Sequence, residues 1–431
     1  MKRKLIEKLA LWKDDHFRKP LLMRGARQVG KTYAVHDFAA IYFSDRYNHF
    51  NFEKNPELCR IFEKNLDPKR ILSELELSSG KKIVPGEDLL FFDEVQECPK
   101  AIMSMRYFYE EMPEMHVIAA GSLIEFALKD ISFPVGRIQM MNVYPMTFAE
   151  FLEATGNELL AGKMANAQFQ FSETVLAKLT EEMYRYFIVG GMPECVQTYL
   201  NTGSYIKVTS VQNDLLATFR QDFSKYAGHA DKRCLQQVFN AVAKKTGTQI
   251  KYAGLSDEFS IPTIKKALEL LEMARIFTKV KSVSPEGTPL GAAASEKRFK
   301  TVFLDIGLLS CINGFYADTT LSKENLLAAF NGQMAEQFVG QELRYKYGEL
   351  LHYWSREAKS SSAEVDYLIE KNGAILPVEV KSGKSGKLKS LHLLLSEYPH
   401  ISEAFVLNEN NYGDITEQRL HFKPLYYVMN L

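Results

Sequence analysis

Short apolar runs that end in polar residues recur through the first third of the chain. Apolar residues fill positions 21–23, 89–92 and 117–120, and the second run ends directly in Asp93 and Glu94. Uninterrupted apolar runs of this length are typical of strands buried on both faces, as in parallel sheets covered by helices. The pattern therefore predicts an α/β fold whose parallel strands carry polar residues at their carboxyl ends, where such folds bind ligands.

Apolar spacing from position 331 onward predicts six further elements in the order αβββαβ. They are a helix over 332–348, strands over 350–357, 363–370 and 374–382, a helix over 387–399 and a strand over 403–408. Asn372-Gly373 is a strong two-residue hairpin signal between the second and third of these strands. Counting outward from that turn places Asp366 directly opposite Glu379, with Lys381 on the same face.

This predicted pairing has a chemical consequence. Cross-strand partners have Cβ atoms about 4.5–5.5 Å apart, so two carboxylates there repel each other unless a cation lies between them. We therefore expect Asp366 and Glu379 to bind Mg²⁺, with Lys381 placed to orient a hydroxide or to stabilise a scissile phosphate. Glu336, on the preceding helix between Gly332 and Gly340, would add a third carboxylate. The alternative is an exposed hairpin with ordinary acids, but apolar residues fill the opposite face in phase: Val365, Tyr367, Val378 and Val380.

Between these two regions the pattern is mainly helical. Residues 156–230 predict a helical lid that packs on the nucleotide face and includes the turn Gly190-Gly191-Met192-Pro193. Residues 231–300 have the spacing of a winged helix-turn-helix, with 260–273 as its recognition helix and Lys265 and Lys266 directed outward. Such modules bind DNA or dock proteins, and both readings stay open.

Length and composition further limit the possible domain organisation and binding partners. A chain of 431 residues is too long for one hydrophobic core, so at least two domains are expected. Fifty-three basic and 53 acidic residues balance, so any nucleic-acid contact must come from a local patch. Five separated cysteines without a CxxC pair indicate neither a disulfide framework nor a zinc site, and they fit buried thiols in a reducing cytoplasm. No apolar run is long enough to predict a membrane span.

A phosphate-binding motif follows the first apolar run. The residues Gly25, Ala26, Arg27, Gln28, Val29, Gly30, Lys31 and Thr32 form GxxxxGK[ST] between a predicted strand and a predicted helix. The glycines let backbone N–H groups close around phosphates, and the helix N-terminus contributes partial positive charge. We expect Lys31 to reach the β- and γ-phosphates of ATP and the Thr32 hydroxyl to bind Mg²⁺.

The second apolar run supplies the other half of an ATPase site. Asp93 is expected to hold Mg²⁺, and Glu94 to orient and polarise the attacking water, which predicts hydrolysis in addition to binding. Ser122, at the end of the third run, is a candidate sensor of the γ-phosphate or simply part of a Gly-Ser turn.

These segments resemble AAA-type P-loop ATPases of bacteria and archaea. The resemblance rests on GARQVGKT at 25–32, DEVQ at 93–96, GS at 121–122, GR at 136–137 and YPMTFAEFL at 144–152. It implies that Arg137 approaches the γ-phosphate as an arginine finger, acting in cis or in trans from a neighbouring subunit. The segment Pro134-Val135-Gly136-Arg137 departs from the family's PGR by one inserted residue, and a surface ion pair of Arg137 is the alternative.

The last segment resembles the PD-(D/E)xK nuclease superfamily, whose D…ExK motif matches Asp366 and Glu379-Val380-Lys381. The order αβββαβ is that of restriction-endonuclease-like folds. The whole arrangement resembles a prokaryotic family that pairs an AAA-type ATPase with a C-terminal nuclease-like domain. The expected domains are an ATPase core (1–155), a lid (156–230), a winged helix (231–300) and a nuclease-like domain (301–431).

Two functions remain open at this stage. The first is a cytoplasmic Mg²⁺-dependent ATPase coupled to a domain that binds DNA and, in one version, cleaves it. The second is an ATP-dependent regulatory switch whose winged-helix and nuclease-like domains bind a protein or nucleic-acid partner without cleavage. Either protein could act as an oligomer.

Overall fold

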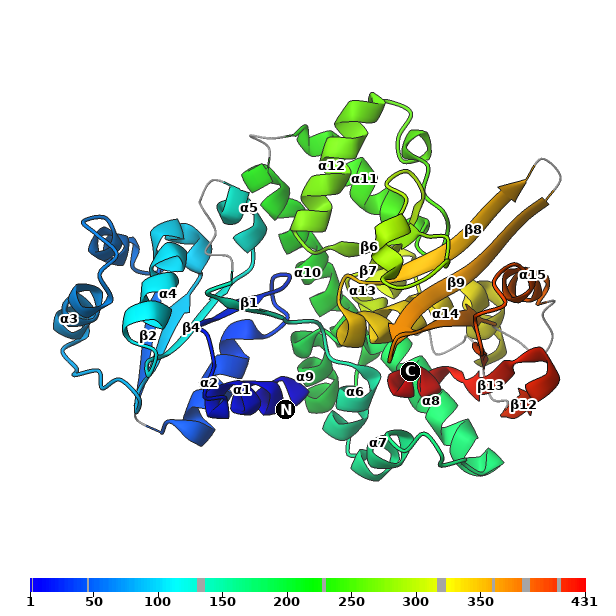
Figure 1. Cartoon of the computed structure of the whole chain (residues 1–431), viewed down its shortest axis with the longest axis horizontal. Helices are drawn as coiled ribbons and strands as arrows, with labels where there is room; N and C mark the ends of the chain where they lie inside the picture. The colour runs from blue at the N-terminus through cyan, green and yellow to red at the C-terminus, as the bar shows by residue number, and fades with distance from the viewer. Residues whose placement is uncertain are drawn as a thin grey trace. The chain divides into compact units, whose positions relative to one another are not determined.

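The computed structural model describes residues 1, 3–44, 46–129, 136–226, 230–315, 323–358, 361–381, 388–408 and 412–431 (Figure 1). The chain forms two compact units. Unit 1 comprises Met1–Tyr144 and Met273–Arg275, and unit 2 comprises Pro145–Glu272 and Ile276–Leu431. Among the described residues, no helix has the length and apolar content that a membrane crossing requires.

Unit 1 is built on a five-stranded parallel sheet in the order β2-β3-β4-β1-β5. Its strands are β1 (Leu21–Arg24), β2 (Tyr47–Asn51), β3 (Leu89–Asp93), β4 (His116–Gly121) and β5 (Gln139–Asn142). Its helices are α1 (Lys4–Asp14), α2 (Lys31–Tyr42), α3 (Pro68–Ser79), α4 (Pro99–Glu111) and α5 (Ile124–Lys129), with short 3-10 helices η1 (Pro56–Phe62) and η2 (Val95–Glu97). Every residue of β3 and β4 is buried, which confirms the prediction of strands covered on both faces.

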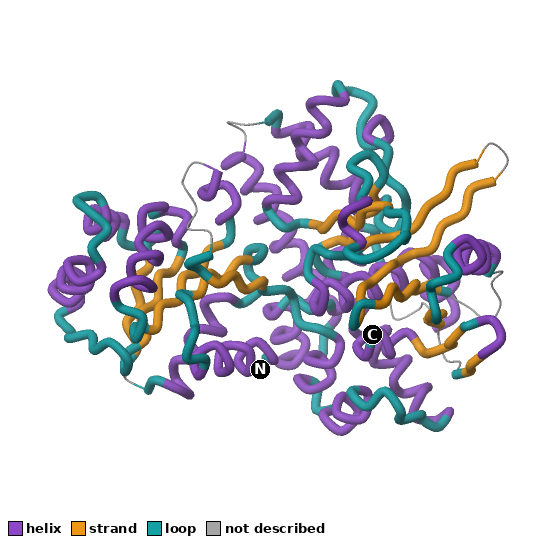
Figure 2. The backbone as a smooth tube through the Cα atoms, viewed as in Figure 1, coloured by secondary structure: helices purple, strands orange, loops and turns teal. Residues whose placement is uncertain are grey.

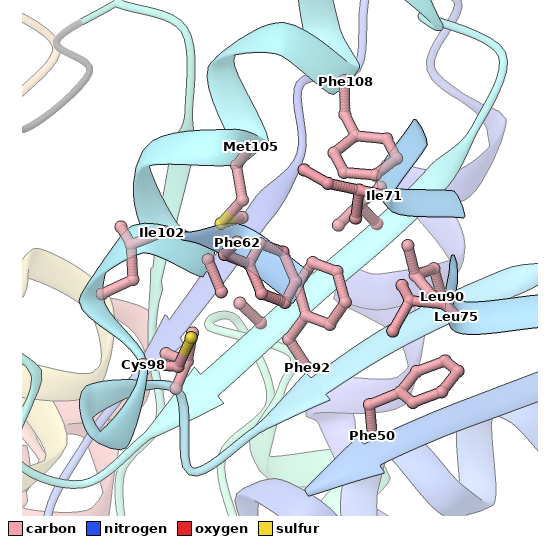
Figure 3. Close-up of a cluster of buried hydrophobic side chains, with 14 of the residues drawn as sticks. Phe50, Phe62, Ile71, Leu75, Leu90, Phe92, Cys98, Ile102, Met105 and Phe108 are labelled. Carbon is pink, nitrogen blue, oxygen red and sulfur yellow. The ribbon is translucent and has the colours of Figure 1, made fainter. Parts of the chain in front are cut away.

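A hydrophobic cluster packs α3 and α4 on one face of this sheet. In Figure 3, Met105 and Phe108 of α4 lie near the aromatic rings of Phe62 and Phe92. The ring centroids of Phe62 and Phe92 are 5.6 Å apart in an edge-to-face arrangement, which is the geometry that aromatic pairs prefer. This packing fixes β3, and therefore the position of the two acids at its end.

Unit 2 contains most of the helices and an eight-stranded sheet. Its helices are α6 (Phe148–Ala154), α7 (Glu158–Met164), α8 (Glu173–Val189), α9 (Pro193–Thr202), α10 (Tyr205–Tyr226), α11 (Lys232–Lys244), most of α12 (Ile261–Met273), α13 (Ile306–Ile312), α14 (Lys323–Tyr347) and α15 (Lys389–Glu397), with 3-10 helices η3 (Tyr252–Gly254), η4 (Leu290–Ala293), η5 (Thr416–Gln418) and η6 (Leu425–Asn430). Its strands are β6 (Phe277–Ser282), β7 (Phe299–Phe303), β8 (His352–Ala358), β9 (Ser361–Lys371), β10 (Ala374–Val380), β11 (Ala404–Asn408), β12 (Gly413–Ile415) and β13 (Leu420–Pro424).

The sheet order is β12-β13-β11-β10-β9-β8-β6-β7, and the predicted element order αβββαβ corresponds to α14, β8, β9, β10, α15 and β11. The long ribbon of β8 and β9 is clear in Figure 2. Asn372 and Gly373 both adopt positive φ angles, as a tight hairpin turn requires. Ala374 pairs with Lys371 and Val378 with Tyr367, which confirms the predicted register.

The predicted winged-helix segment continues into the same sheet. Helices α11 and α12 are followed by β6 and β7, which pair antiparallel. Strand β6 also pairs in parallel with β8, through Lys281 with His352 and Ser282 with Tyr353. The expected domain boundary between residues 300 and 301 falls inside β7. The hairpin of β6 and β7 extends the sheet that the last hundred residues form.

The glycine turn at 190–191 is packed inside unit 2. The Gly191 N–H donates to Asp305 Oδ2 at 2.6 Å, and a Cβ on Gly191 would lie 2.1 Å from the Met146 carbonyl oxygen. Burial raises the pKa of Asp305 to about 6, although backbone N–H donors partly offset this shift. Only glycine fits here, so the turn anchors the segment after residue 145 to α13.

Candidate functional site

The loop between β1 and α2 has the geometry of a phosphate cradle. Gln28 and Gly30 adopt left-handed backbone conformations, and α2 begins immediately afterwards at Lys31. A Cβ on Gly25 would lie 2.3 Å from the Val143 carbonyl oxygen, so only glycine allows this approach. The first N–H groups of α2, which have no partner within the helix, therefore lie next to the loop. This is the arrangement that binds anions.

Lys31 folds back onto its own loop. Its Nζ donates to the carbonyl oxygens of Gly25 (3.0 Å) and Ala26 (2.8 Å), and its side chain is buried. Burial lowers the pKa of Lys31 to about 8, against the opposing effect of Glu94 and Asp93. A buried cation held only by neutral carbonyls is well suited to move onto a phosphate, because charge-assisted hydrogen bonds are stronger than neutral ones.

Asp93 joins the loop to the sheet. The Thr32 hydroxyl donates to Asp93 Oδ1 at 3.1 Å, and Asn51 Nδ2 donates to Asp93 Oδ2 at 3.1 Å. His49 Nε2 lies 3.2 Å from the same oxygen. Burial alone would raise the pKa of Asp93, but hydrogen bonds from His49, Thr32 and Asn51 together hold it below its usual value. The hydroxyl and the carboxylate are oxygen ligands that Mg²⁺ prefers, so the pair fits this ion.

His49 and Asn51 were missed in the sequence. They alternate along β2 with the buried Phe50 and with Phe52, which follows the strand, so strand periodicity puts both polar side chains on one face. This periodicity can be seen in the sequence, but the pairing of β2 with β3 in the sheet cannot.

Glu94 and Ser122 occupy the same edge of the sheet. Glu94 has a left-handed conformation with φ of 50°, and Gln96 Nε2 donates to Glu94 Oε2 at 2.7 Å. A Cβ on Gly121 would lie 2.3 Å from Gln96 Oε1, so the glycine admits the amide that holds Glu94. Ser122 is buried, and its hydroxyl oxygen has no hydrogen-bond partner among the described residues.

Arg137 takes part in a surface ion pair. Its Nε lies 2.9 Å from Glu110 Oε1, and about half of its side chain is exposed. Pro134 and Val135, the part of this segment that contains the one-residue insertion, lie outside the described residues. Among the other loop residues, Arg27 is half-buried, and the Val29 carbonyl accepts a hydrogen bond from Arg3 at 3.2 Å. Sequence reasoning gave no role to Arg3, which also donates to the Tyr144 carbonyl at 2.8 Å and so ties the loop to the end of unit 1.

A second group of ionisable residues lies on the sheet of unit 2. Lys300 on β7 is 1% exposed, and its Nζ lies 2.6 Å from Glu336 Oε1, 2.7 Å from Glu364 Oε1 and 3.3 Å from Asp366 Oδ1. We call Lys300, Glu336, Glu364, Asp366, Glu379 and Lys381 the acidic cluster. Neither Lys300 nor Glu364 was predicted from the sequence. Lys300 lies 64 and 66 residues before its partners Glu364 and Asp366 on β9, so local sequence patterns do not reveal these contacts.

The two predicted strand acids are held differently. Asp366 Oδ2 accepts a hydrogen bond from the Val380 N–H at 2.8 Å, and Lys381 Nζ lies 2.6 Å from Glu379 Oε1. Burial, reinforced by Asp366, raises the pKa of Glu379 to about 7 and that of Glu336 to about 8. Within the described residues, no three His, Cys, Asp or Glu side chains converge as a metal site.

Close packing of α14 supports this arrangement. A Cβ on Gly340 would lie 2.3 Å from the Tyr367 hydroxyl oxygen and 2.5 Å from Val302 Cγ2. The Tyr367 hydroxyl donates to the Glu336 carbonyl at 2.9 Å. The expectation that a small residue lets this helix approach the sheet is confirmed at Gly340.

Comparison with protein families assigns the first third of the chain. Residues 17–152 match a family model described as an AAA domain, and these residues form an AAA-type P-loop ATPase domain. Residues 180–319 and 331–427 each match a domain of unknown function, DUF8612 and DUF4143 respectively.

Individual relatives are distant. The uncharacterized protein MJ1544 of Methanocaldococcus jannaschii is 23% identical over 356 residues, covering 80% of this chain and 70% of that protein. The Walker-type ATPase PABY2304 of Pyrococcus abyssi is 16% identical with a TM-score of 0.46, covering 73% of this chain and 95% of the other. The Orc1 protein of Aeropyrum pernix, solved in complex with DNA, is 12% identical with a TM-score of 0.27, covering 74% and 93%.

Proposed function

We propose that the chain binds and hydrolyses ATP in a Mg²⁺-dependent reaction at the loop of residues 25–32. The observation that carries this proposal is the contact between Thr32 and Asp93, which joins the phosphate loop to the acidic end of β3 beside Glu94. A hydroxyl and a carboxylate in contact are the oxygen pair that holds Mg²⁺ in P-loop ATPases.

Each residue of the site has a separate task in this proposal. The loop N–H groups and Lys31 bind the phosphates, and Thr32 and Asp93 hold the metal ion. Bound Mg²⁺ neutralises phosphate charge and orients the γ-phosphate for attack. Glu94, oriented by Gln96, accepts a hydrogen bond from the attacking water and polarises it.

Two further residues contribute charge and sensing. The buried Ser122 hydroxyl donates to the γ-phosphate. Arg137 leaves Glu110 and stabilises the charge that spreads over the γ-phosphate in the transition state. An exposed ion pair of this kind contributes little to stability, so its loss is a small cost.

Nucleotide affinity tests the binding step. Lys31→Ala should weaken binding of a fluorescent ATP analogue with Mg²⁺ by at least about 100-fold, because it removes a buried charge-assisted contact. Lys69→Ala on the exposed start of α3 is the control and should bind as the wild type does. Equal affinity of the Lys31→Ala and wild-type proteins for the analogue would contradict the proposal that this loop binds ATP.

For unit 2 we propose a winged helix built on α11, α12 and the hairpin of β6 and β7, followed by a restriction-endonuclease-like domain that binds DNA and cleaves it with Mg²⁺. The supporting observations are the hairpin register, the ion pair of Glu379 with Lys381, and a buried Glu379 Oε2 that has no hydrogen-bond partner among the described residues. A regulatory switch that binds its partner without cleavage is the second candidate, and the half-exposed Lys265–Glu269 pair on α12 marks a solvated helix face suited to docking.

A cleavage assay separates these two functions. Wild-type protein should nick labelled single-stranded, double-stranded or branched DNA with Mg²⁺ or Mn²⁺, Glu379→Gln should abolish nicking, and Glu417→Gln on the exposed η5 should not. If the wild type cuts none of these substrates with either metal, the regulatory function replaces the nuclease.

A further inference from the structure

Lys300 is the only lysine of β7 and one of the most deeply buried charged residues described in unit 2. Its ammonium lies between three carboxylates from two elements: Glu336 on α14, and Glu364 and Asp366 on β9. It also lies 5.2 Å from the centroid of the Tyr353 ring on β8. Burial alone would lower the pKa of Lys300, but the carboxylates of Glu336, Asp366 and Glu364 outweigh this effect and raise it well above its usual value.

Two separate segments of the chain build this site. Lys300 belongs to the 180–319 family segment, whereas the carboxylates belong to the 331–427 segment. The turn after α11 also reaches it, since a Cβ on Gly247 would lie 3.0 Å from Glu336 Oε2. The C-terminal segment alone therefore lacks the cation on which its carboxylates converge.

Among the described residues, the acidic cluster holds more carboxyl groups than ammonium groups. Four carboxylates, those of Glu336, Glu364, Asp366 and Glu379, face only two ammonium groups, those of Lys300 and Lys381. Glu379 is 5% exposed, and its Oε2 is buried without a hydrogen-bond partner among the described residues. A buried carboxylate oxygen without a partner is costly unless it binds a proton or a cation, so this oxygen leaves a position at which a further positively charged ligand can bind.

We propose that the Lys300 ammonium and a divalent metal ion are alternative occupants of the acidic cluster. This inference rests on the proposed metal-binding role of Glu336, Asp366 and Glu379. With Lys300 in place, the carboxylates of Glu336, Glu364 and Asp366 surround its ammonium, and no three of the described acids are arranged to hold a metal ion. A metal ion must draw Glu336 and Asp366 away from Lys300, so Lys300 acts as a positioning residue that weakens metal binding and keeps the metal-free site intact.

Manganese titration of the full chain tests this competition. All proteins carry Asp93→Asn, so that the nucleotide loop does not contribute a metal site. Free Mn²⁺ is measured by electron paramagnetic resonance for this background, for Lys300→Met and for the control Lys281→Met, whose ammonium pairs with the exposed Glu296. Lys300→Met should bind Mn²⁺ at least about tenfold more tightly, because it removes a positive charge a few ångströms from the ion. Lys281→Met should match the background.

Thermal unfolding gives a second readout. In EDTA, Lys300→Met should lower the Tm by at least about 5 °C, because it leaves buried carboxylates without their cation. Saturating Mn²⁺ should restore most of that loss. If Lys300→Met does not fold in EDTA, Lys300→Gln is used, and refolding of either variant should succeed with Mn²⁺.

Unchanged Mn²⁺ affinity in both Lys300 variants would overturn the inference, and so would a failure of Mn²⁺ to restore their folding or Tm. Tighter Mn²⁺ binding by Lys300→Met together with no DNA cleavage by any variant would support the inference while removing the proposed nuclease activity. Failure of the inference about Lys300 and failure of the proposed nuclease activity are therefore distinguishable.

Discussion

Asp93 is held by donors from two different elements. Thr32 comes from α2, and Asn51 and His49 come from β2. Groups that hold a metal-binding carboxylate in place restrict its orientation and typically matter 10- to 100-fold for metal affinity. The local sequence around Asp93 therefore describes only part of the site.

Asn51→Ala tests this support at the residue scale. Loss of the 3.1 Å hydrogen bond should raise the Mg²⁺ concentration for half-maximal ATP turnover about tenfold, because Asp93 is no longer fixed. The control is Asn201→Ala on α9, whose side-chain oxygen accepts a hydrogen bond from Gln197 Nε2 at 2.8 Å. An unchanged Mg²⁺ dependence in Asn51→Ala would show that Thr32 and His49 suffice.

The residues predicted from sequence share one property. Lys31, Thr32 and Asp93 lie in short motifs in which spacing along the chain determines spacing in the fold. Arg3 and Lys300 could not be found in this way, because each meets its partners through contacts distant in the sequence.

At the scale of elements, the hairpin of β9 and β10 was predictable and its surroundings were not. Asn372-Gly373 specifies a two-residue turn, and the turn specifies the register. The pairing of β6 with β8 involves residues 71 positions apart, and no turn encodes it. That pairing is what brings Lys300 into the acidic cluster, so the predicted four-domain division could not anticipate it.

Gly340→Ala tests the packing of α14 on this sheet. The added Cβ would collide with Tyr367 and Val302, so we expect a loss of about 1–3 kcal/mol in the unfolding free energy. Gly162→Ala on α7 makes the same change in open space and should be neutral or stabilising by up to about 1 kcal/mol. Calorimetric melting of both variants measures the difference, and equal melting would contradict the close approach of helix and sheet.

At the scale of the whole molecule, the chemistry divides between the two units. Unit 1 holds the nucleotide loop, Asp93 and Glu94, and unit 2 holds the acidic cluster. We propose that ATP turnover in unit 1 regulates the activity of unit 2, and this coupling requires that unit 1 hydrolyses ATP in the full chain.

Single-turnover hydrolysis by the full chain tests that requirement most directly. Glu94→Gln should bind ATP with wild-type affinity and hydrolyse it at least about 100-fold more slowly, because the amide cannot polarise the attacking water. Glu97→Gln, three residues away and exposed, should keep the wild-type rate. Wild-type hydrolysis by Glu94→Gln would contradict the proposed ATPase site.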